Sequence, residues 1–382
     1  MIIINIFVAS VTKRIFVLKK MTRVLTYPEI DPQQWQALID RSPYATWFQT
    51  KEAYEFYAAL SSELIPFAFG IEECRGDEAM RQLGDKDGRR LVGVIVGYIT
   101  RERNALKQFF TRRAIIIGGP VIDEDATAEE ITALLNAVKK LQRSDLQPLG
   151  RSTAKRSTGL SPIYIETRNF HDYSRWKEVF QNAGFAYQPH LNFHVDTSSM
   201  ELVESRLGKN RKRDIKTSIR DGAMIIEHPT IEQVRTYYAL LKHLYTTKIK
   251  TPLFSWEFFE KLYAHPNGRF ILVEFNGEII GGTVCVVLPN KCIYEWFVCG
   301  RDGEWKSIFP SSLATYAGIR YAAEHGCSRF DMMGAGKPDE AYGVRDFKAR
   351  FGGEQVEYGR FLCVRKPLLY WIGKMGVKLL KK

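Results

Sequence analysis

The chain has 382 residues, of which 45% are hydrophobic and 26% charged, and its formal net charge is +12. This length and composition predict a globular protein with a large buried core and about two domains. The excess charge lies at the ends, because residues 1–20 and 365–382 contain basic residues and no acid. A nearly neutral body argues against a basic coat for nucleic acid, although local basic patches are compatible with it.

The six cysteines are scattered without a Cys-x-x-Cys pair, and several lie in apolar runs. This pattern predicts reduced, buried thiols in a cytoplasmic protein, and it argues against a disulfide framework or a zinc site. In residues 1–20 the charges follow the apolar run, which is the wrong order for a secretory signal. We interpret this segment as a mis-called start or a disordered stretch before a true start at Met21, with a weak membrane-touching segment as the alternative.

The first half of the chain predicts alternating helices and strands. Residues 31–60 have the spacing of one or two helices, with a break at 42–44 and Thr50 as the cap of the second. The elements expected next are a strand at 64–72, a polar hairpin loop at 75–90, strands at 91–100 and 114–122, an amphipathic helix at 129–141, a flexible excursion at 144–161, a strand at 163–167 and a short helix at 176–182.

The second half repeats this order of elements. The expected elements are strands at 270–275, 278–288 and 292–299, a type I′ turn at Asn276-Gly277, a helix capped by Ser311 or Ser312 and running to His325, and a strand at 330–333. Strand, strand, strand, helix, strand thus occurs at 64–167 and again at 270–333. We interpret this as an internal duplication of an α/β unit with mixed sheets.

The segment between the halves, 202–222, is strongly basic and predicts a helix that ends at Gly222. Clustered Lys and Arg donate hydrogen bonds to phosphate oxygens, so Arg211, Lys216 and Arg220 are candidates for binding phosphate groups. The alternative is a solvated basic face of a helix.

Two other patterns are weak signals for a ligand site. His190 and His194 fall on one face of a predicted strand and could hold a metal, but no third ligand is apparent, so no metal is expected. Residues 334–337 resemble part of a P-loop, but the glycine spacing and Pro338 do not fit that motif.

The stretch 326–358 is the strongest candidate for a functional site. It places a charged loop between two strand-like runs, and loops that follow strand ends usually carry binding groups. Phe-Asp-x-x-Gly stands at 330–334, and Phe-Lys-x-x-Phe-Gly-Gly stands at 347–353. The alternative is a solvated loop whose Phe347 and Phe351 pack in the core.

These two motifs and their order resemble the C-terminal signature of the Fem family, the aminoacyl-tRNA-dependent peptidyltransferases that build the side bridges of peptidoglycan. The resemblance covers most of the chain from 21 to 358, and it is strongest over 269–353. It implies two tandem GNAT-like domains, at 21–189 and 190–355. We also expect 356–382 to hold a strand returning to the first domain and a basic amphipathic C-terminal helix.

The resemblance further implies an activity and roles for particular residues. An amino acid would pass from aminoacyl-tRNA, the co-substrate, to an amine of a UDP- or lipid-linked peptidoglycan precursor, without a further cofactor. Lys348 matches the family lysine that stabilises developing charge, and Asp331 and Asp346 would be proton acceptors. Arg220 stands in an Arg-Asp-Gly that matches the family segment binding the diphosphate of the precursor, and Arg211 and Lys216 upstream match that segment in charge only. Arg345, Phe347 and Tyr342 would complete the substrate site.

Two features bear on the acyl donor. A GNAT enzyme that uses acyl-CoA holds the diphosphate on N–H groups of a Gly-rich turn that opens a helix, and neither 300–313 nor 122–131 contains such a turn. Unlike some Fem members, the chain has no visible helical-hairpin insertion for tRNA, and Lys51 lies out of register with their precursor-binding lysine. The rival functions are an acyl-CoA-dependent N-acyltransferase acting on a sugar or polysaccharide and a non-catalytic binder of anionic cell-wall lipids.

Residues after Pro367 have the spacing of an amphipathic helix with one apolar and one basic face and a Trp near the border. This pattern predicts peripheral contact with an anionic membrane, at the inner face of the cytoplasmic membrane. The alternative is a helix that packs on the first domain with solvated lysines.

Overall fold

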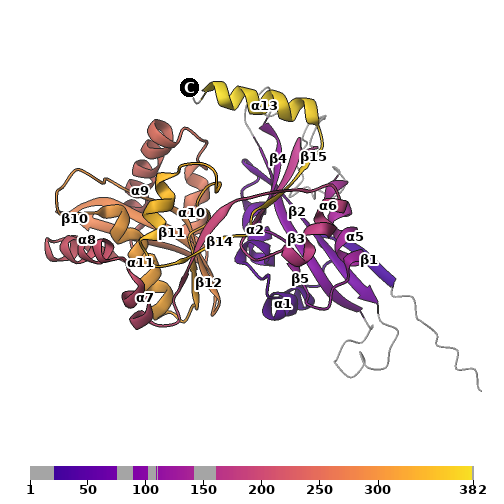
Figure 1. The fold of residues 1–382 in the computed structure, drawn as a ribbon, viewed down its shortest axis with the longest axis horizontal. Coiled ribbons are helices and arrows are strands. Elements are labelled where there is room, and N and C mark those ends of the chain that lie inside the picture. Colours follow the sequence, from indigo (N-terminus) through magenta and orange to yellow (C-terminus); the bar gives the residue numbers. More distant parts are fainter. Residues whose placement is uncertain (1–20, 75–88, 102–108, 110, 142–160, 381–382) are drawn as a thin grey trace, which may run out of the picture.

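The computed structural model describes residues 21–74, 89–101, 109, 111–141 and 161–380. The interpretation of residues 1–20, and nearly all of the expected hairpin loop at 75–90 and excursion at 144–161, lie outside these ranges. Within the described residues two mixed sheets stand side by side (Figure 1). The expected fold class, α/β with mixed sheets, is confirmed.

The first sheet belongs mainly to the N-terminal half. Its strand order is β1 (Met21–Thr26), β2 (Leu64–Cys74), β3 (Arg89–Thr100), β4 (Arg113–Gly118), β6 (Tyr164–Asn169), β15 (Arg360–Val364) and β7 (Ala186–Gln188), with β5 (Val121–Ile122) paired to β3. Its helices are α1 (Pro32–Arg41), α2 (Lys51–Ala59), α5 (Ala128–Lys139) and α6 (Lys177–Asn182). Thr50 caps α2 as expected, because its Oγ1 accepts from Ala53 N at 3.2 Å.

The second sheet has the order β14 (Glu354–Glu357), β8 (Leu191–Asp196), β13 (Arg329–Asp331), β12 (Cys292–Gly300), β11 (Glu278–Leu288), β10 (Gly268–Phe275) and β9 (Met224–Ile226). The helices of this half are α7 (Met200–Arg206), α8 (Lys209–Arg220), α9 (Ile231–Leu244), α10 (Trp256–Ala264), α11 (Pro310–Glu324) and α12 (Gly343–Ala349). A final helix, α13 (Pro367–Leu380), follows β15.

The expected duplication is visible in the topology. In each half three antiparallel strands are followed by a helix and by a strand parallel to the third, which makes the parallel pairs β4–β6 and β12–β13. Asn276 and Gly277 both have positive φ, as a type I′ turn requires. The helix after β12 differs from expectation. It begins at Pro310 rather than at a Ser cap, because Pro suits the first helical position.

The two sheets exchange strands. The chain leaves the first sheet after β7, enters the second as β8 beside β13, and returns from β14 to the first sheet as β15 beside β6. β8 and β15 therefore occupy equivalent places in the two sheets. The chain reaches each of them by crossing over from the other sheet (Figure 1).

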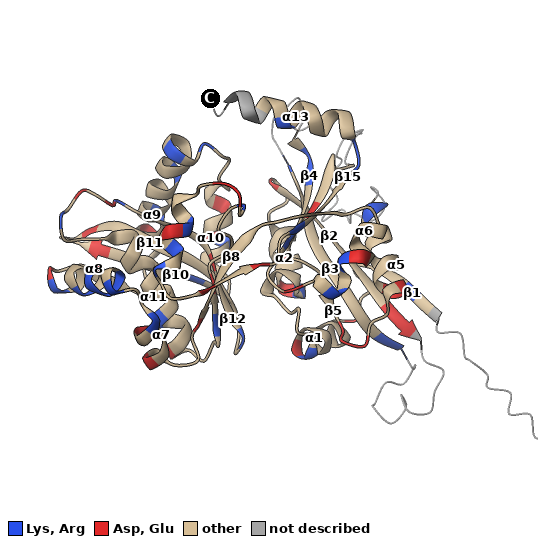
Figure 2. Ribbon diagram, viewed as in Figure 1, with Lys and Arg blue, Asp and Glu red and all other residues tan. Residues whose placement is uncertain are grey.

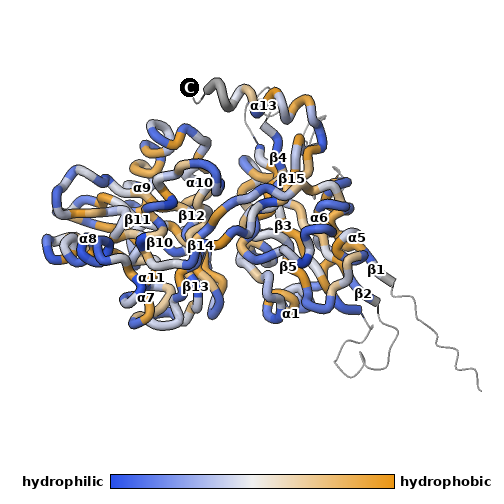
Figure 3. Tube along the Cα trace, in the orientation of Figure 1, coloured by the Kyte–Doolittle hydropathy of each residue, from blue (hydrophilic) through white to orange (hydrophobic). Residues whose placement is uncertain are grey.

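Three apolar clusters hold these layers together, and the hydrophobic residues gather in the strands of both sheets (Figure 3). One face of the first sheet packs on α5 and α6, and one face of the second packs on α7, α8 and α11. The other faces share a single cluster that contains residues of α1, α2, α9 and α10. Its aromatic contacts join the halves directly, since Phe48 and Tyr294 have ring centroids 5.3 Å apart. The halves are therefore packed as one body.

Candidate functional site

The strands β12 and β13 diverge early, and the candidate site lies where they separate. They pair at only three positions, the last joining Tyr294 to Asp331, although β12 continues to Gly300. After Asp331 the chain turns toward β8, where Met332 N donates to Phe193 O at 3.0 Å. Met333 has φ 53, a left-handed conformation that is uncommon outside glycine and concentrates at functional sites. The carbonyls of this turn lose their strand partner on the β12 side.

Lys348 supplies partners for those carbonyls. It lies on the inner side of α12, is only 7% exposed, and donates through Nζ to Met332 O and to Gly334 O, the latter at 2.8 Å. An ammonium group has three N–H bonds. The described residues accept two of them, which leaves one for a ligand.

The buried Lys348 shares its surroundings with Glu295 of β12. Burial lowers the pKa of Lys348, and the charges of Glu295 and Asp331 oppose that shift. Burial likewise raises the pKa of Glu295, against the charge of Lys348. Thr283 Oγ1 donates to Glu295 Oε1 at 3.4 Å. A charged residue inside the apolar strand at 292–299 was the available signal for this group, and sequence reasoning did not use it.

Asp331 fixes the other side of the turn. Its Oδ1 accepts from Asn192 Nδ2 at 2.8 Å and from Met333 N at 2.7 Å, and its Oδ2 lies 3.0 Å from His194 Nε2. Burial alone would raise the pKa of Asp331, but His194, Arg329 and Asn192 together bring it below its usual value. Asn192 Oδ1 also accepts from Gly334 N at 2.7 Å. Asp331 and Lys348 therefore bind the same turn. Asp331 accepts from one of its N–H groups, and Lys348 donates to two of its carbonyls.

The Asp331 cluster continues into the first domain. Arg329 of β13 approaches His171 Nε2 at 3.4 Å, and the same nitrogen lies 3.2 Å from Ala45 O. Burial, and then the charge of Arg329, lowers the pKa of His171 to about 3, so this ring is neutral at physiological pH. The candidate site thus adjoins the junction between the halves.

The family comparison bears on this same part of the chain. Residues 208–348 match the family model described as "Acetyltransferase (GNAT) domain". The second half therefore contains a GNAT-type acyltransferase domain. The match ends at Lys348 and includes the whole turn that Lys348 and Asp331 hold.

Solved structures extend the likeness to the whole chain. The chain resembles a protein described as FemX with a TM-score of 0.63 and 12% identity, over 92% of this chain and 99% of that one. It also resembles a tandem GNAT protein from the clavulanic acid biosynthesis pathway, with a TM-score of 0.52 and 9% identity, over 90% of this chain and 98% of the other. No curated protein matches the sequence. At these identities the likeness shows the tandem GNAT fold.

The helix N-termini that would receive the diphosphate of CoA do not fit that group. In α11 the first position is Pro310, which has no N–H, and Ser311 N donates to the carboxylate of Asp302 at 3.1 Å. In α5 the first turn carries Glu129 and Glu130, and the Glu130 side chain closes a capping box with Thr127. Carboxylates occupy the places where an anion would bind and would repel it.

Several residues that were predicted to lie in the site instead pack against neighbouring residues in the structure. The Arg211 guanidinium is buried against the rings of Phe347 and Phe351, at 4.5 and 4.6 Å from their centroids, and donates to Ser312 Oγ. Arg345 donates to four carbonyls of the loop at 335–340, the nearest being Lys337 O. Phe347 therefore lies over Arg211, and Arg345 organises the loop.

The remaining predicted residues lie on the surface. Asp346 is on the outer side of α12, opposite Lys348, and Tyr342 is 46% exposed just before that helix. Lys216 and Arg220 are exposed on α8, where Lys and Arg follow the helix (Figure 2). Arg220 pairs with Asp221 at 2.7 Å, which leaves Lys216 as the freer cation. The structure thus brings together Lys348 and Asp331, but not Asp346.

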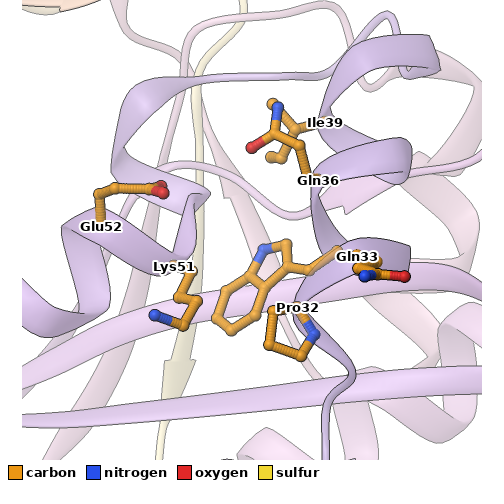
Figure 4. Close-up of a pocket in the computed structure, with 7 residues that line it drawn as sticks. Pro32, Gln33, Gln36, Ile39, Lys51 and Glu52 are labelled. Carbon is orange, nitrogen blue, oxygen red and sulfur yellow. The ribbon is translucent and has the colours of Figure 1, made fainter.

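A shallow hollow lies elsewhere, between α1 and α2 (Figure 4). Lys51 and Glu52 border it on one side, and Pro32, Gln33 and Gln36 border it on the other. Lys51 donates to Glu55, its neighbour one helical turn away. This hollow does not include the diverging strands of the second sheet.

Proposed function

We propose that this protein is an aminoacyltransferase of the Fem type, which moves an amino acid from aminoacyl-tRNA to an amine of a peptidoglycan precursor. The observation that carries the proposal is the pair of carboxylate-filled helix N-termini, at Asp302 and at Glu129 and Glu130. A GNAT fold without a place for the diphosphate of CoA needs a different activated acyl donor. An amino acid esterified to a ribose is such a donor, and the motifs at 330–334 and 347–353 resemble those of the Fem family.

In the proposed reaction the acceptor nitrogen attacks the ester carbonyl carbon and forms a C–N bond. The C–O bond to the ribose then breaks, and the proton lost by the amine passes through an aspartate to the leaving ribose oxygen. The ester is already activated, so stabilising the negative charge on the tetrahedral intermediate matters more than a strong base. Lys348 would provide that charge through its third N–H, since the other two bind Met332 O and Gly334 O.

Asp331 and Asp346 have unequal support as proton acceptors. Asp331 is buried at the start of the turn that Lys348 binds, whereas Asp346 is exposed. Asp331 in the ionised form, which its lowered pKa favours, would also steady the charge of Lys348. The exposed Lys216 and Arg220 remain candidates for contact with the diphosphate of a UDP- or lipid-linked acceptor.

The deciding experiment compares acyl donors on the purified protein. A pool of aminoacyl-tRNAs and acetyl-CoA are each offered with UDP-linked and with lipid-linked precursor, and the products are identified by mass spectrometry. We expect an amino acid added to the precursor peptide only with aminoacyl-tRNA. Transfer from acetyl-CoA alone would favour the rival sugar N-acyltransferase, and no transfer with tight binding of the precursor would favour the non-catalytic binder. Cell-wall peptides from a deletion strain give the matching measurement in vivo.

A further inference from the structure

The C-terminal helix α13 exposes its apolar side, which is the reverse of an ordinary surface helix. It lies at one end of the first domain and extends toward the second (Figure 1). Its residues Leu368 and Trp371 are 71% and 60% exposed, and Ile372 and Met375 are also exposed. These four side chains lie on one face at helical spacing, and Figure 3 shows hydrophobic stretches along α13. Together they form a continuous apolar stripe, which we call the α13 stripe.

The base of α13 is firmly attached to the first domain. Both Arg365 N and Lys366 N donate to Ile163 O, at 2.9 and 3.0 Å. The Tyr370 ring, on the opposite side from the stripe, packs edge-on against Tyr164 with centroids 5.3 Å apart. The helix therefore cannot simply roll over to bury its stripe against the domain. The stripe is held facing outward.

The charge around the stripe indicates what covers it. Residues 365–382 contain six basic residues and no acid. Lys374 is exposed on α13 beside Trp371. An apolar stripe bordered by Trp and by lysines matches the boundary of an anionic bilayer, where the apolar side chains enter the acyl region and the lysines meet the headgroups. A second copy of this tail would instead bring like charges together.

We propose that α13 is a peripheral membrane anchor, which lies flat in the interface of a bilayer containing anionic lipid. None of the helices in the described part of the chain is both long and apolar enough to cross a membrane. The anchor therefore holds the protein on the surface of the bilayer. It is independent of the acyl donor and of the chemistry at Lys348. The anchor proposal goes beyond the proposed function, and it can be wrong while the proposed function is right.

The test is vesicle cosedimentation of the full-length chain, with no tRNA or precursor present. Vesicles of phosphatidylcholine with phosphatidylglycerol are compared with phosphatidylcholine alone, at low and at high salt. We expect the protein to bind the anionic vesicles at low salt. At high salt its affinity should fall by about tenfold or more, since exposed charges are screened. The triple variant Leu368→Gln/Trp371→Gln/Ile372→Gln should lose at least about tenfold in affinity. It keeps Tyr370, and its thermal unfolding should match that of the parent protein.

A matched control replaces a large exposed apolar residue elsewhere. Met224 of β9 is 55% exposed, and Met224→Gln should bind vesicles as the parent does. Equal binding by the triple variant and the parent would overturn the proposal, whatever other segment binds. Equal binding to neutral and anionic vesicles would also overturn it. So would a parent that binds no vesicles but forms a dimer, by analytical ultracentrifugation, that the triple variant loses.

Discussion

Each domain has a place where neighbouring strands lose their regular pairing, and each fills it with one buried side chain. In the first domain the Gln49 amide bridges β3 and β4. Its Nε2 donates to Val96 O and to Ile117 O, both at 2.8 Å, and its Oε1 accepts from Val96 N at 2.7 Å. In the second domain Lys348 donates to Met332 O and Gly334 O, two carbonyls of the single segment that leaves β12.

Gln49 is neutral and Lys348 is charged, and this difference supports the proposal that only the second site takes part in chemistry. A neutral amide donates and accepts, so the strands alone satisfy Gln49. A buried ammonium only donates, and Glu295 and Asp331 have to offset the desolvation of Lys348. A gap that needs only filling is closed at lower free energy by a neutral group. A retained buried charge therefore points to chemistry in the second domain.

The parallel strand pairs differ in the same sense. In the first domain β4 and β6 pair at six consecutive positions, from Arg113–Tyr164 to Gly118–Asn169. In the second domain β12 and β13 pair at three. Only the second pair opens early enough for a side chain from a third element, α12, to enter between the diverging strands.

The largest expected effect comes from removing the charged filler. Lys348→Met should lower kcat by about 10²–10³-fold, because the oxyanion loses its stabilising charge. Its unfolding free energy should change little, since relief of the buried charge offsets the two lost hydrogen bonds. Steady-state kinetics with urea denaturation measures both. A folded Lys348→Met enzyme that turns over at the parent rate would remove Lys348 from the mechanism.

Removing the neutral filler should give the opposite result. Gln49→Met leaves three buried backbone groups of β3 and β4 without partners, so we expect a loss of about 2–4 kcal/mol in unfolding free energy. The value of kcat per folded molecule should stay within about twofold of the parent. A large fall in kcat without a loss of stability would show that the first domain also takes part in the chemistry.

The two aspartates can be separated in the same way. Asp331→Asn should lower both kcat and unfolding free energy, the latter by about 2 kcal/mol, because Asp331 accepts from Asn192 and Met333 and faces His194. Asp346→Asn should change stability by less than about 0.5 kcal/mol, since its side chain is exposed. The reverse ranking of the two kcat values would transfer the proton-acceptor role to Asp346.

The smallest expected effect concerns the charges outside the diverging strands. Lys216→Gln/Arg220→Gln should raise KM for a diphosphate-bearing acceptor several-fold more than it lowers kcat, and should weaken the salt dependence of binding. Arg211→Gln is the contrasting variant, because the Arg211 guanidinium packs against Phe347 and Phe351 and its loss should lower stability. Unchanged acceptor affinity at every salt concentration would reduce Lys216 and Arg220 to a solvated helix face.

Local patterns predicted most elements of the fold. Apolar runs rich in Val and Ile indicated β3 and β4, and the capping pattern indicated α2. The short helix α12 was missed, because seven residues that begin with Gly343 carry too little periodicity to separate a helix from a loop. The helices α9 and α10 were not identified either. The basic segment was expected as one helix, but it forms α7 and α8 with a break at 207–208.

The candidate site was harder to predict from the sequence than the fold. Lys348 and Asp331 were chosen from motifs, and the structure brings them to one turn. Glu295, Asn192 and His194 became partners of that turn only through strand pairing between distant segments, which no local pattern contains. The burial of Arg211 depends on two rings about 140 residues further along the chain, so its charge alone suggested an exposed role.

The strand exchange ties the order of synthesis to the order of folding. The place between β6 and β7 can be filled only by β15, which is made when residues 360–364 leave the ribosome. Until then the first sheet has an unpaired edge at β6, the kind of edge that invites pairing with another chain. The N-terminal half therefore cannot finish folding while it is being translated. A chain cut anywhere before β15 should be prone to aggregation rather than yield an independent domain.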